Sequence, residues 1–255
     1  MSDGLTLSHQ NLSHQNMNHQ YLSHRDNRLL AALPREILEL MGGDLSQICL
    51  AQGQTIYEPG EQIEEIYFPQ SGMISLLVVT TDGEAIDTAT IGREGAVGLH
   101  SALGKRRSFT RATIQISGKS SVIRATAFAQ FARDHAPVRD LVTRYTEFLW
   151  AGAQQIAACN AVHDTSARLC RLLLQTADCA DSDQITLTQE LVADMLGVRR
   201  TTVTLLAQSL EHRGLIRYAR GRITILNRDQ LERCACECYA VMRQEEPPVK
   251  SGAHV

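Results

Sequence analysis

The stretch from Ile185 to Leu226 limits the fold of this chain more than any other, because it holds two helical patterns separated by one glycine. In the first pattern, apolar residues recur on one side of a helix that begins at Thr186 or Thr188, where a hydroxyl oxygen can cap it. Gly197 ends this pattern, since glycine adopts the left-handed conformation at little cost. A second helix is expected from about Arg199, so the stretch predicts a helix-turn-helix.

The second predicted helix ends before Gly214 and has a polar side opposite its apolar side. When Val203 is placed at the centre of the buried side, the outer side and the first turn carry Arg199, Arg200, Thr201, Thr204, Leu205 and Gln208. Arginine can bind guanine with two hydrogen bonds, glutamine can do the same with adenine, and an apolar group can contact the thymine methyl. We therefore expect these six residues to read bases of double-stranded DNA.

A short hairpin is expected after Gly214, because Leu215–Tyr218 and Arg222–Leu226 alternate like strands around Ala219–Gly221. The segment 186–228 has seven arginines and three acidic residues, a net charge of +4, whereas the whole chain has a net charge of −3. A basic segment in an acidic chain favours phosphate binding. The residues expected to contact phosphates are Thr188, Gln189, Thr202, Arg217, Arg220 and Arg222. The hairpin is then the wing of a winged helix-turn-helix.

The run LTQELVADMLGVRRTTVTLLAQSLEHRGLI resembles the DNA-binding domain of the Crp/Fnr family, the bacterial regulators that include the cyclic-AMP receptor protein. The resemblance implies a transcription regulator with no catalytic activity, binding a two-fold symmetric operator as a homodimer, with a sensor domain upstream. It also implies RNA polymerase and a small-molecule effector of unknown identity as further partners. The phosphate-binding glycine loop, the zinc-protease motif and the nucleophile elbow are all missing from the sequence, which argues against an enzyme.

Residues 28–136 are expected to form a sensor domain that begins with a short helical element. From Gln52 to Ala125 many glycines lie between short β-type runs, which is typical of a β-barrel or sandwich. The expected strands are Thr55–Tyr57, Ile66–Phe68, Met73–Val79, Ala85–Ile91, Thr110–Ile116 and Ser121–Arg124. Asp82–Gly83 predicts a hairpin between two of them. The runs YEPGEQIEEIYFPQSGMISLL and ATIGREGAVGL resemble the jelly-roll cyclic-nucleotide-binding domain of the same family. The fold class expected is therefore α+β, with a jelly roll, a long helix and a winged helix-turn-helix.

The resemblance also indicates where an effector would bind in the sensor domain. The corresponding residues are Gly98, Leu99, Arg107, Ser108, Ala153 and Gln154. Nucleotide-binding members have a glutamate after the glycine, and it takes the ribose hydroxyl, but here that residue is Leu99. An apolar side chain cannot hold a hydroxyl group, so we expect this fold without affinity for cyclic AMP.

Residues 137–161 are expected to form one long helix, the dimerisation helix of the family. Its apolar seam is formed by Val138, Leu141, Val142, Tyr145, Leu149 and Ile156. The seam predicts a two-helix dimer interface, but packing against the chain's own barrel would account for the same pattern. The winged domain is expected to follow at residues 162–235.

Both ends of the chain are expected to be tails, 1–27 and 236–255. The first is a five-residue repeat with histidines at 9, 14, 19 and 24, a pattern typical of disorder. Near the second, Cys234, Cys236 and Cys238 lie in what would be a continuous helix, where Cys236 points away from the other two. We therefore expect no metal site and no cofactor. The alternative is a metal- or redox-sensing regulator that uses the histidine repeat or these cysteines.

The composition indicates the class of protein and its expected location in the cell. With 44% hydrophobic and 21% charged residues, it is typical of a globular protein. Neither a membrane-spanning run nor a signal peptide can be read in the sequence, so we expect no membrane association and a cytoplasmic location. Seven cysteines in a reducing compartment predict no disulfide framework.

Overall fold

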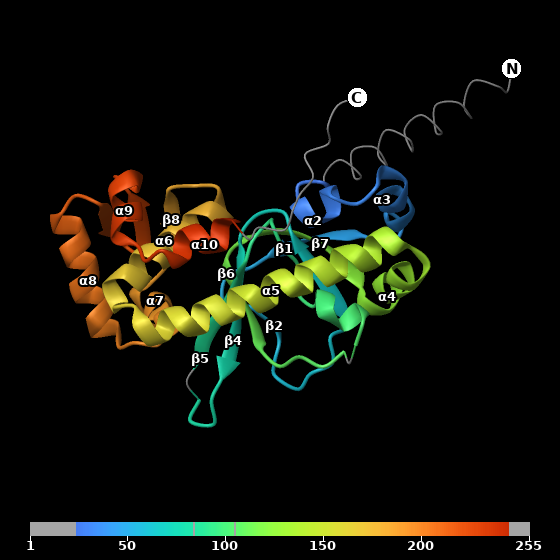
Figure 1. Ribbon diagram of the computed structural model, residues 1–255, viewed down its shortest axis with the longest axis horizontal. Helices are drawn as coiled ribbons and strands as arrows, with labels where there is room; N and C mark the ends of the chain where they lie inside the picture. Colours follow the sequence, from blue (N-terminus) through green and yellow to red (C-terminus); the bar gives the residue numbers. More distant parts are fainter. Residues whose placement is uncertain (1–23, 84, 105, 245–255) are drawn as a thin grey trace, which may run out of the picture.

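The computed structural model describes residues 24–83, 85–104 and 106–244, which form a β-rich part, a long helix and a mixed part (Figure 1). The first part contains α2 (Arg28–Ala31), α3 (Arg35–Met41), β1 (Ser46–Leu50), β2 (Thr55–Tyr57), β3 (Glu65–Pro69), β4 (Met73–Val79), β5 (Ala85–Ile91), the 3₁₀ helix η1 (Leu99–Ala102), β6 (Arg111–Ile116), β7 (Gly118–Arg124) and α4 (Ala125–Asp134). The remainder contains α5 (Ala136–Val162), α6 (Thr165–Ala180), β8 (Gln184–Thr186), α7 (Gln189–Leu196), α8 (Arg200–His212), β9 (Ile216–Ala219), β10 (Arg222–Ile225), α9 (Arg228–Cys234) and α10 (Cys238–Gln244).

The strands of the β-rich part form two antiparallel sheets, as expected for a jelly roll. One sheet has the order β1-β7-β3 and the other β2-β6-β4-β5. The predicted hairpin at Asp82–Gly83 joins β4 to β5, with Val79 opposite Ala85 and Gly83 at a φ of 87°. Strand β1 was not expected from the sequence, since four of its five residues are exposed and give no alternating pattern.

The N-terminal boundary predicted at residue 27 is wrong, because the folded part already includes His24 and Asn27. His24 is buried, and its Nδ1 lies 2.7 Å from the Ser121 hydroxyl. The Asn27 side-chain amide donates to the carbonyl oxygens of Pro69 and Gly95, both at 2.8 Å. These contacts hold the start of α2 against the barrel. His9, His14 and His19 of the histidine repeat lie outside the described residues.

Helix α5 packs on the β-rich part of its own chain along the seam predicted for dimerisation. Val138, Leu141, Val142 and Tyr145 are all at most 4% exposed and belong to the core shared with the barrel. The backbone N–H of Ala96 donates to the Tyr145 hydroxyl at 2.9 Å. The prediction of a dimer interface at these four residues is therefore wrong, and the alternative of packing on the chain's own barrel holds for them.

The part after α5 has its own core and a three-stranded sheet of order β8-β10-β9. Strand β8 was not predicted, and it widens the expected hairpin by pairing with β10. The C-terminal boundary predicted at residue 235 is also wrong. Cys236, Cys238 and Tyr239 are buried, and α10 extends the folded part to Gln244.

The β-rich part and the part after α5 contact each other directly. The Met73 side chain belongs to the core of the second part, and the Ile86 side chain lies next to the turn glycine Gly197. Arg93 and Asp181 form an ion pair across the junction at 3.2 Å. Over the described ranges, none of the helices has the length and apolar character needed to cross a bilayer.

Candidate nucleic-acid interface and sensor pocket

The helix-turn-helix is built by one capping hydroxyl and one turn glycine. The Thr188 hydroxyl accepts a hydrogen bond from the Leu191 backbone N–H at 3.2 Å, which fixes the start of α7. Gly197 has a φ of 63°, and the following N–H of Val198 returns to the Ala193 carbonyl at 3.0 Å. Helix α8 therefore leaves the turn at an angle to α7. It lies at the end of the molecule away from the barrel (Figure 1).

The outer side of α8 is the one expected from the sequence. Thr201, Leu205 and Gln208 are exposed, and the Leu205 side chain is 67% exposed although it is apolar. Arg199 precedes the helix and is exposed as well. An exposed leucine between polar residues has no folding role in the chain, and it suits contact with a thymine methyl.

Two of the predicted base-reading residues already have partners within the chain. The Thr204 hydroxyl donates to Gln189 Oε1 at 2.7 Å, and Thr204 is half-buried. The Arg200 guanidinium lies 3.5 Å from Glu190, and both side chains are largely exposed. Gln189 on α7 thus orients Thr204 of α8, and the neighbouring Glu190 lies within ion-pair distance of Arg200. The helical pattern alone did not suggest this connection.

The wing turns over Arg220 and Gly221, whose φ angles are 51° and 74°. A two-residue turn with both residues left-handed matches the twist of a hairpin. The flanking residues Arg217 and Arg222 are exposed, as is Arg220 itself. The wing therefore carries three exposed arginines.

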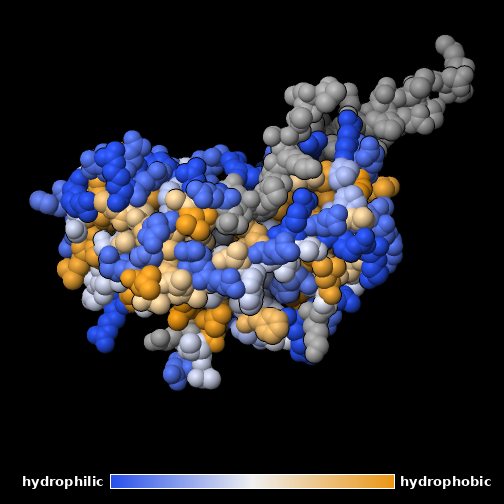
Figure 2. All heavy atoms as spheres, in the orientation of Figure 1, coloured by the Kyte–Doolittle hydropathy of each residue, from blue (hydrophilic) through white to orange (hydrophobic). Residues whose placement is uncertain are grey.

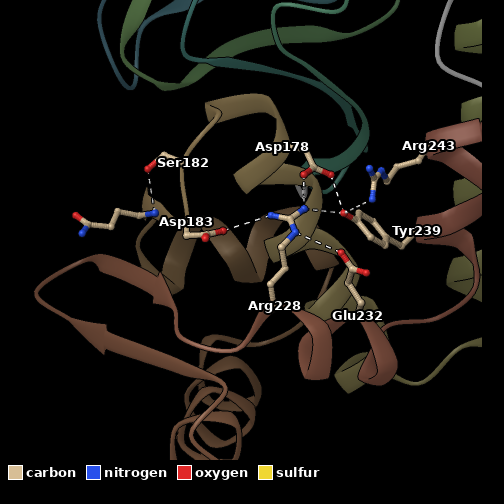
Figure 3. A network of polar contacts seen from close by, with 8 residues as sticks. Asp178, Ser182, Asp183, Arg228, Glu232, Tyr239 and Arg243 are labelled. Atoms are coloured by element: carbon tan, nitrogen blue, oxygen red, sulfur yellow. Dashed lines mark hydrogen bonds and ion pairs between the residues drawn. The ribbon is translucent and has the colours of Figure 1, made fainter.

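Arg228 also contributes to the positive charge of the segment, but it contacts acidic side chains of its own domain (Figure 3). Its guanidinium contacts Asp178, and it lies 3.3 Å from both Asp183 and Glu232. It also donates to the Tyr239 hydroxyl at 2.8 Å, which in turn donates to Asp178. This network, which we call the Arg228 network, joins α6, α9 and α10.

Most of the residues expected to line an effector pocket are instead buried in the barrel or hydrogen-bonded to its backbone. Leu99 is 1% exposed and lies in the core. Arg107 donates to the Gly60 carbonyl at 2.9 Å, and the buried Ser108 hydroxyl donates to the Thr110 carbonyl at 2.5 Å. Gly98 has a φ of 86° at the start of η1. The other two candidates, Ala153 and Gln154, are exposed on α5.

A cavity of about 430 Å³ opens between β2 and β3, but its lining is acidic. It is formed by Ile56, Tyr57, Glu61, Gln62, Glu64, Glu65 and Tyr67. Three carboxylates repel an anionic phosphate, so this cavity does not suit a cyclic nucleotide.

Comparison with known proteins gives matches in both parts of the chain. Residues 47–135 match the family model of the cyclic nucleotide-binding domain, and residues 167–234 match that of the Crp-like helix-turn-helix domain. The chain belongs to the Crp/Fnr family. It is therefore a DNA-binding transcription regulator of Crp/Fnr type. No curated protein matches it.

Solved structures of Crp/Fnr regulators share the whole architecture at low sequence identity. FixK2 from Bradyrhizobium japonicum is similar with a TM-score of 0.66 and 18% identity, over 75% of this chain and 98% of that one. TTHB099, a CRP-family regulator from Thermus thermophilus, has a TM-score of 0.61 and 24% identity, over 74% and 96%. The c-di-GMP responsive regulator CLP from Xanthomonas campestris has a TM-score of 0.63 and 14% identity, over 76% and 100%. At these identities the likeness supports the fold alone.

The Crp/Fnr regulator has a second cavity, of about 480 Å³, at the junction between its two parts. The buried carboxylate of Asp87 lines it together with Arg171. Asp87 accepts hydrogen bonds from the Ser75 hydroxyl at 2.8 Å, the Thr90 hydroxyl at 3.2 Å and the Ala89 N–H at 3.0 Å. Burial nevertheless raises the pKa of Asp87 to about 6. Nothing in the sequence pointed to this group, because an aspartate within a strand is usually exposed.

The regulator also brings three cysteines and one histidine together at the end of α5. The ligand atoms of Cys159, His163, Cys236 and Cys238 all lie within 4.8 Å of one another. The prediction that Cys236 points away from Cys238 is wrong, because α9 ends at Cys234 and the chain is extended at Ala235. No sequence signal paired these cysteines with Cys159 and His163, more than seventy positions earlier.

Proposed function

We propose that the regulator binds a two-fold symmetric operator as a homodimer, with one α8 helix in each of two successive major grooves. The observation that carries this proposal is the exposed outer side of α8, with Thr201, Leu205 and Gln208 beside a wing of three arginines. In such dimers the half-sites lie about 34 Å apart, one turn of DNA.

The division of roles follows from side-chain chemistry and exposure. Arg199, Arg200, Thr201, Leu205 and Gln208, with Thr204 held by Gln189, are proposed to read bases. Thr188, Gln189, Thr202, Arg217, Arg220 and Arg222 are proposed to hold phosphates on either side of the groove.

The dimer interface is proposed on the side of α5 that faces away from the barrel. Thr143, Thr146, Trp150, Ala153 and Ala157 recur at alternating spacings of three and four, and all are exposed. This is the spacing of a two-helix coiled coil, with alanines where helices approach closely. Trp150 is 67% exposed, a large aromatic surface that a second copy of α5 would cover. Figure 2 shows apolar and polar side chains interspersed along the face that α5 crosses.

We further propose that cyclic AMP is not the effector. Leu99 fills the core where the family's glutamate would hold a ribose, and Arg107 is bound to Gly60. Adding cyclic AMP or cyclic GMP should leave the melting temperature and the DNA affinity of the protein unchanged. A rise in melting temperature with either nucleotide would contradict this. RNA polymerase stays a proposed partner on the strength of the family alone.

The operator can be found by incubating the purified protein with genomic fragments at moderate salt and sequencing those retained. A two-fold symmetric motif with half-sites one turn apart is expected. Retention without any shared motif, lost evenly as salt rises, would contradict the proposed sequence-specific dimer.

A further inference from the structure

We propose that Cys159, His163, Cys236 and Cys238 bind one zinc ion, which fastens the end of α5 to the C-terminal end of the DNA-binding domain. The four ligand atoms already lie within 4.8 Å of one another. Three sulfurs and one imidazole nitrogen make up a common ligand set of structural zinc sites.

The distances within the cluster fit a tetrahedral zinc ion. Zinc with Zn–S bonds of about 2.3 Å and Zn–N bonds of about 2.0–2.1 Å holds two sulfurs about 3.8 Å apart, and a sulfur and a nitrogen about 3.6 Å apart. The sulfurs of Cys159 and Cys236 are 3.6 Å apart, and Cys238 Sγ lies 3.6 Å from His163 Nδ1. Two edges of the tetrahedron are thus already formed, and small side-chain movements would complete it.

The backbone places the ligands at the ends of helices. Cys159 lies in the last turn of α5, and His163 follows as the residue that ends it. Helix α9 stops at Cys234, and the extended Ala235 leads into Cys236 just before α10 begins at Cys238. The three cysteines are at most 6% exposed, so the sulfurs are shielded from solvent.

Two neighbouring side chains support the ligands as outer partners do in zinc sites. The Glu237 carboxylate lies 3.1 Å from His163 Nε2. A proton on Nε2 would be shared with this carboxylate, leaving the Nδ1 lone pair for the metal. The Gln155 amide donates to Cys238 Sγ at 3.0 Å, a contact that stabilises a thiolate.

Positive charge on α6 would offset the charge of the site. Three thiolates and one Zn²⁺ leave a net charge of −1 in a largely buried place, which is costly without a counter-charge. Arg168 and Arg171 both interact electrostatically with Cys159, and Arg171 is itself buried. A buried Arg171 and a half-buried Arg168 beside a cysteine cluster fit the metal-bound form better than neutral thiols.

The Arg228 network (Figure 3) fixes α10 at the residue after the ligand Cys238. Tyr239 follows Cys238 directly, and its hydroxyl is held by Asp178 of α6 and Arg228 of α9. All four coordination positions are filled by the chain, so no open position is left for a substrate. The site would therefore fix the orientation of the DNA-binding domain relative to α5 and would not catalyse a reaction.

The test measures zinc in the full-length chain without DNA, so that its outcome is independent of the operator. His9, His14 and His19 are replaced by glutamine to remove the N-terminal repeat as a competing ligand. The protein is purified under anaerobic reducing conditions and supplied with zinc. Unbound metal is then removed, and the zinc content is measured. We expect one zinc ion per chain, and absorption bands of tetrahedral cobalt with thiolate ligands when Co²⁺ replaces it.

Matched variants identify the ligands. His163→Gln and Cys236→Ser should lose the zinc, whereas Cys49→Ser, an exposed cysteine outside the cluster, should keep it. Glu237→Gln should bind zinc roughly 10- to 100-fold more weakly, as expected when an outer partner is lost. If a ligand variant misfolds, its loss of zinc proves nothing. The cobalt spectrum is measured on the chain with an intact cluster, so it still shows whether thiolates bind the metal.

Two results would overturn the proposal. One is an intact cluster that takes up no metal under these conditions, including a chain in which Cys159 and Cys236 are found joined as a disulfide. The other is equal zinc content in the intact, His163→Gln and Cys236→Ser chains.

Discussion

At the scale of single residues, Asp87 carries the clearest electrostatic consequence. Its carboxylate is buried at the junction cavity, with hydroxyl and amide donors and with Arg171 as the charged group acting on it. Because its pKa is about 6 in the folded chain against 3.8 ordinarily, the folded state binds the proton more tightly than the unfolded state. This part of the stability is therefore gained as pH falls from 6 towards 4, and lost as pH rises through 6.

Asp87→Asn should remove that dependence. The free energy of unfolding of the unaltered chain should fall by up to about 3 kcal/mol between pH 4 and pH 7 relative to the variant, since one pKa unit corresponds to about 1.4 kcal/mol. Urea unfolding of both chains across this range measures it. If the free energy of unfolding changed with pH in the same way in both chains, the pKa of Asp87 would be ordinary and the prediction would be wrong.

Single substitutions can also distinguish base-reading from phosphate-binding residues in α8 and the wing. Gln208→Ala should weaken binding to the preferred operator by about 1–3 kcal/mol and leave binding to random DNA unchanged. Arg222→Ala should weaken both and reduce the slope of log affinity against log salt by about one. Filter binding or fluorescence anisotropy at several salt concentrations distinguishes them. Equal losses on random DNA would reject the division of roles.

At the scale of elements, α5 shows why its role was partly misread from sequence. The strongest apolar stripe marked the side with Val138, Leu141 and Tyr145, and that side packs on the barrel of the same chain. Periodicity reports that a side is buried without reporting what buries it. The opposite side, with Trp150 among threonines and alanines, is weakly apolar and gave no such signal.

Trp150→Glu tests the interface proposed on this side. A charge placed in a helix pair should shift the protein from dimer to monomer and abolish cooperative operator binding, while each domain stays folded. Sedimentation velocity measures the shift. Arg144→Glu, exposed on α5 but away from the proposed seam, is the matched control and should stay dimeric. A dimer unchanged by Trp150→Glu would place the interface elsewhere.

Most elements could be predicted from sequence, and the exceptions share a physical cause. The helix-turn-helix rests on local signals, a capping threonine and a left-handed glycine, and both are found where expected. Strand β8 and the junction between Cys234 and Cys238 depend on partners distant in sequence: β10 in one case, and α5 and α6 in the other. Local patterns hold no information about such partners.

At the scale of the whole molecule, the proposed zinc site lies where α5 meets the DNA-binding domain. Removing zinc with a chelator should loosen that connection. We expect affinity for the operator to fall roughly 5- to 150-fold, the usual range of coupling between linked sites. Affinity measured with and without chelator tests this. The Cys238→Ser chain provides the control, because chelator should have no effect on it.

The sulfurs of Cys159 and Cys236 belong to residues 77 positions apart, yet they lie 3.6 Å from each other. The chain that follows α5 thus returns, after Cys234, to the end of that same helix. A segment with adjoining ends can be cut out and replaced as a cassette, or have its native termini joined and new ones opened elsewhere. Exchange of residues 160–244, which keeps Tyr239 and the Arg228 network together, would then give chimaeric regulators that keep this β-rich part and recognise other operators.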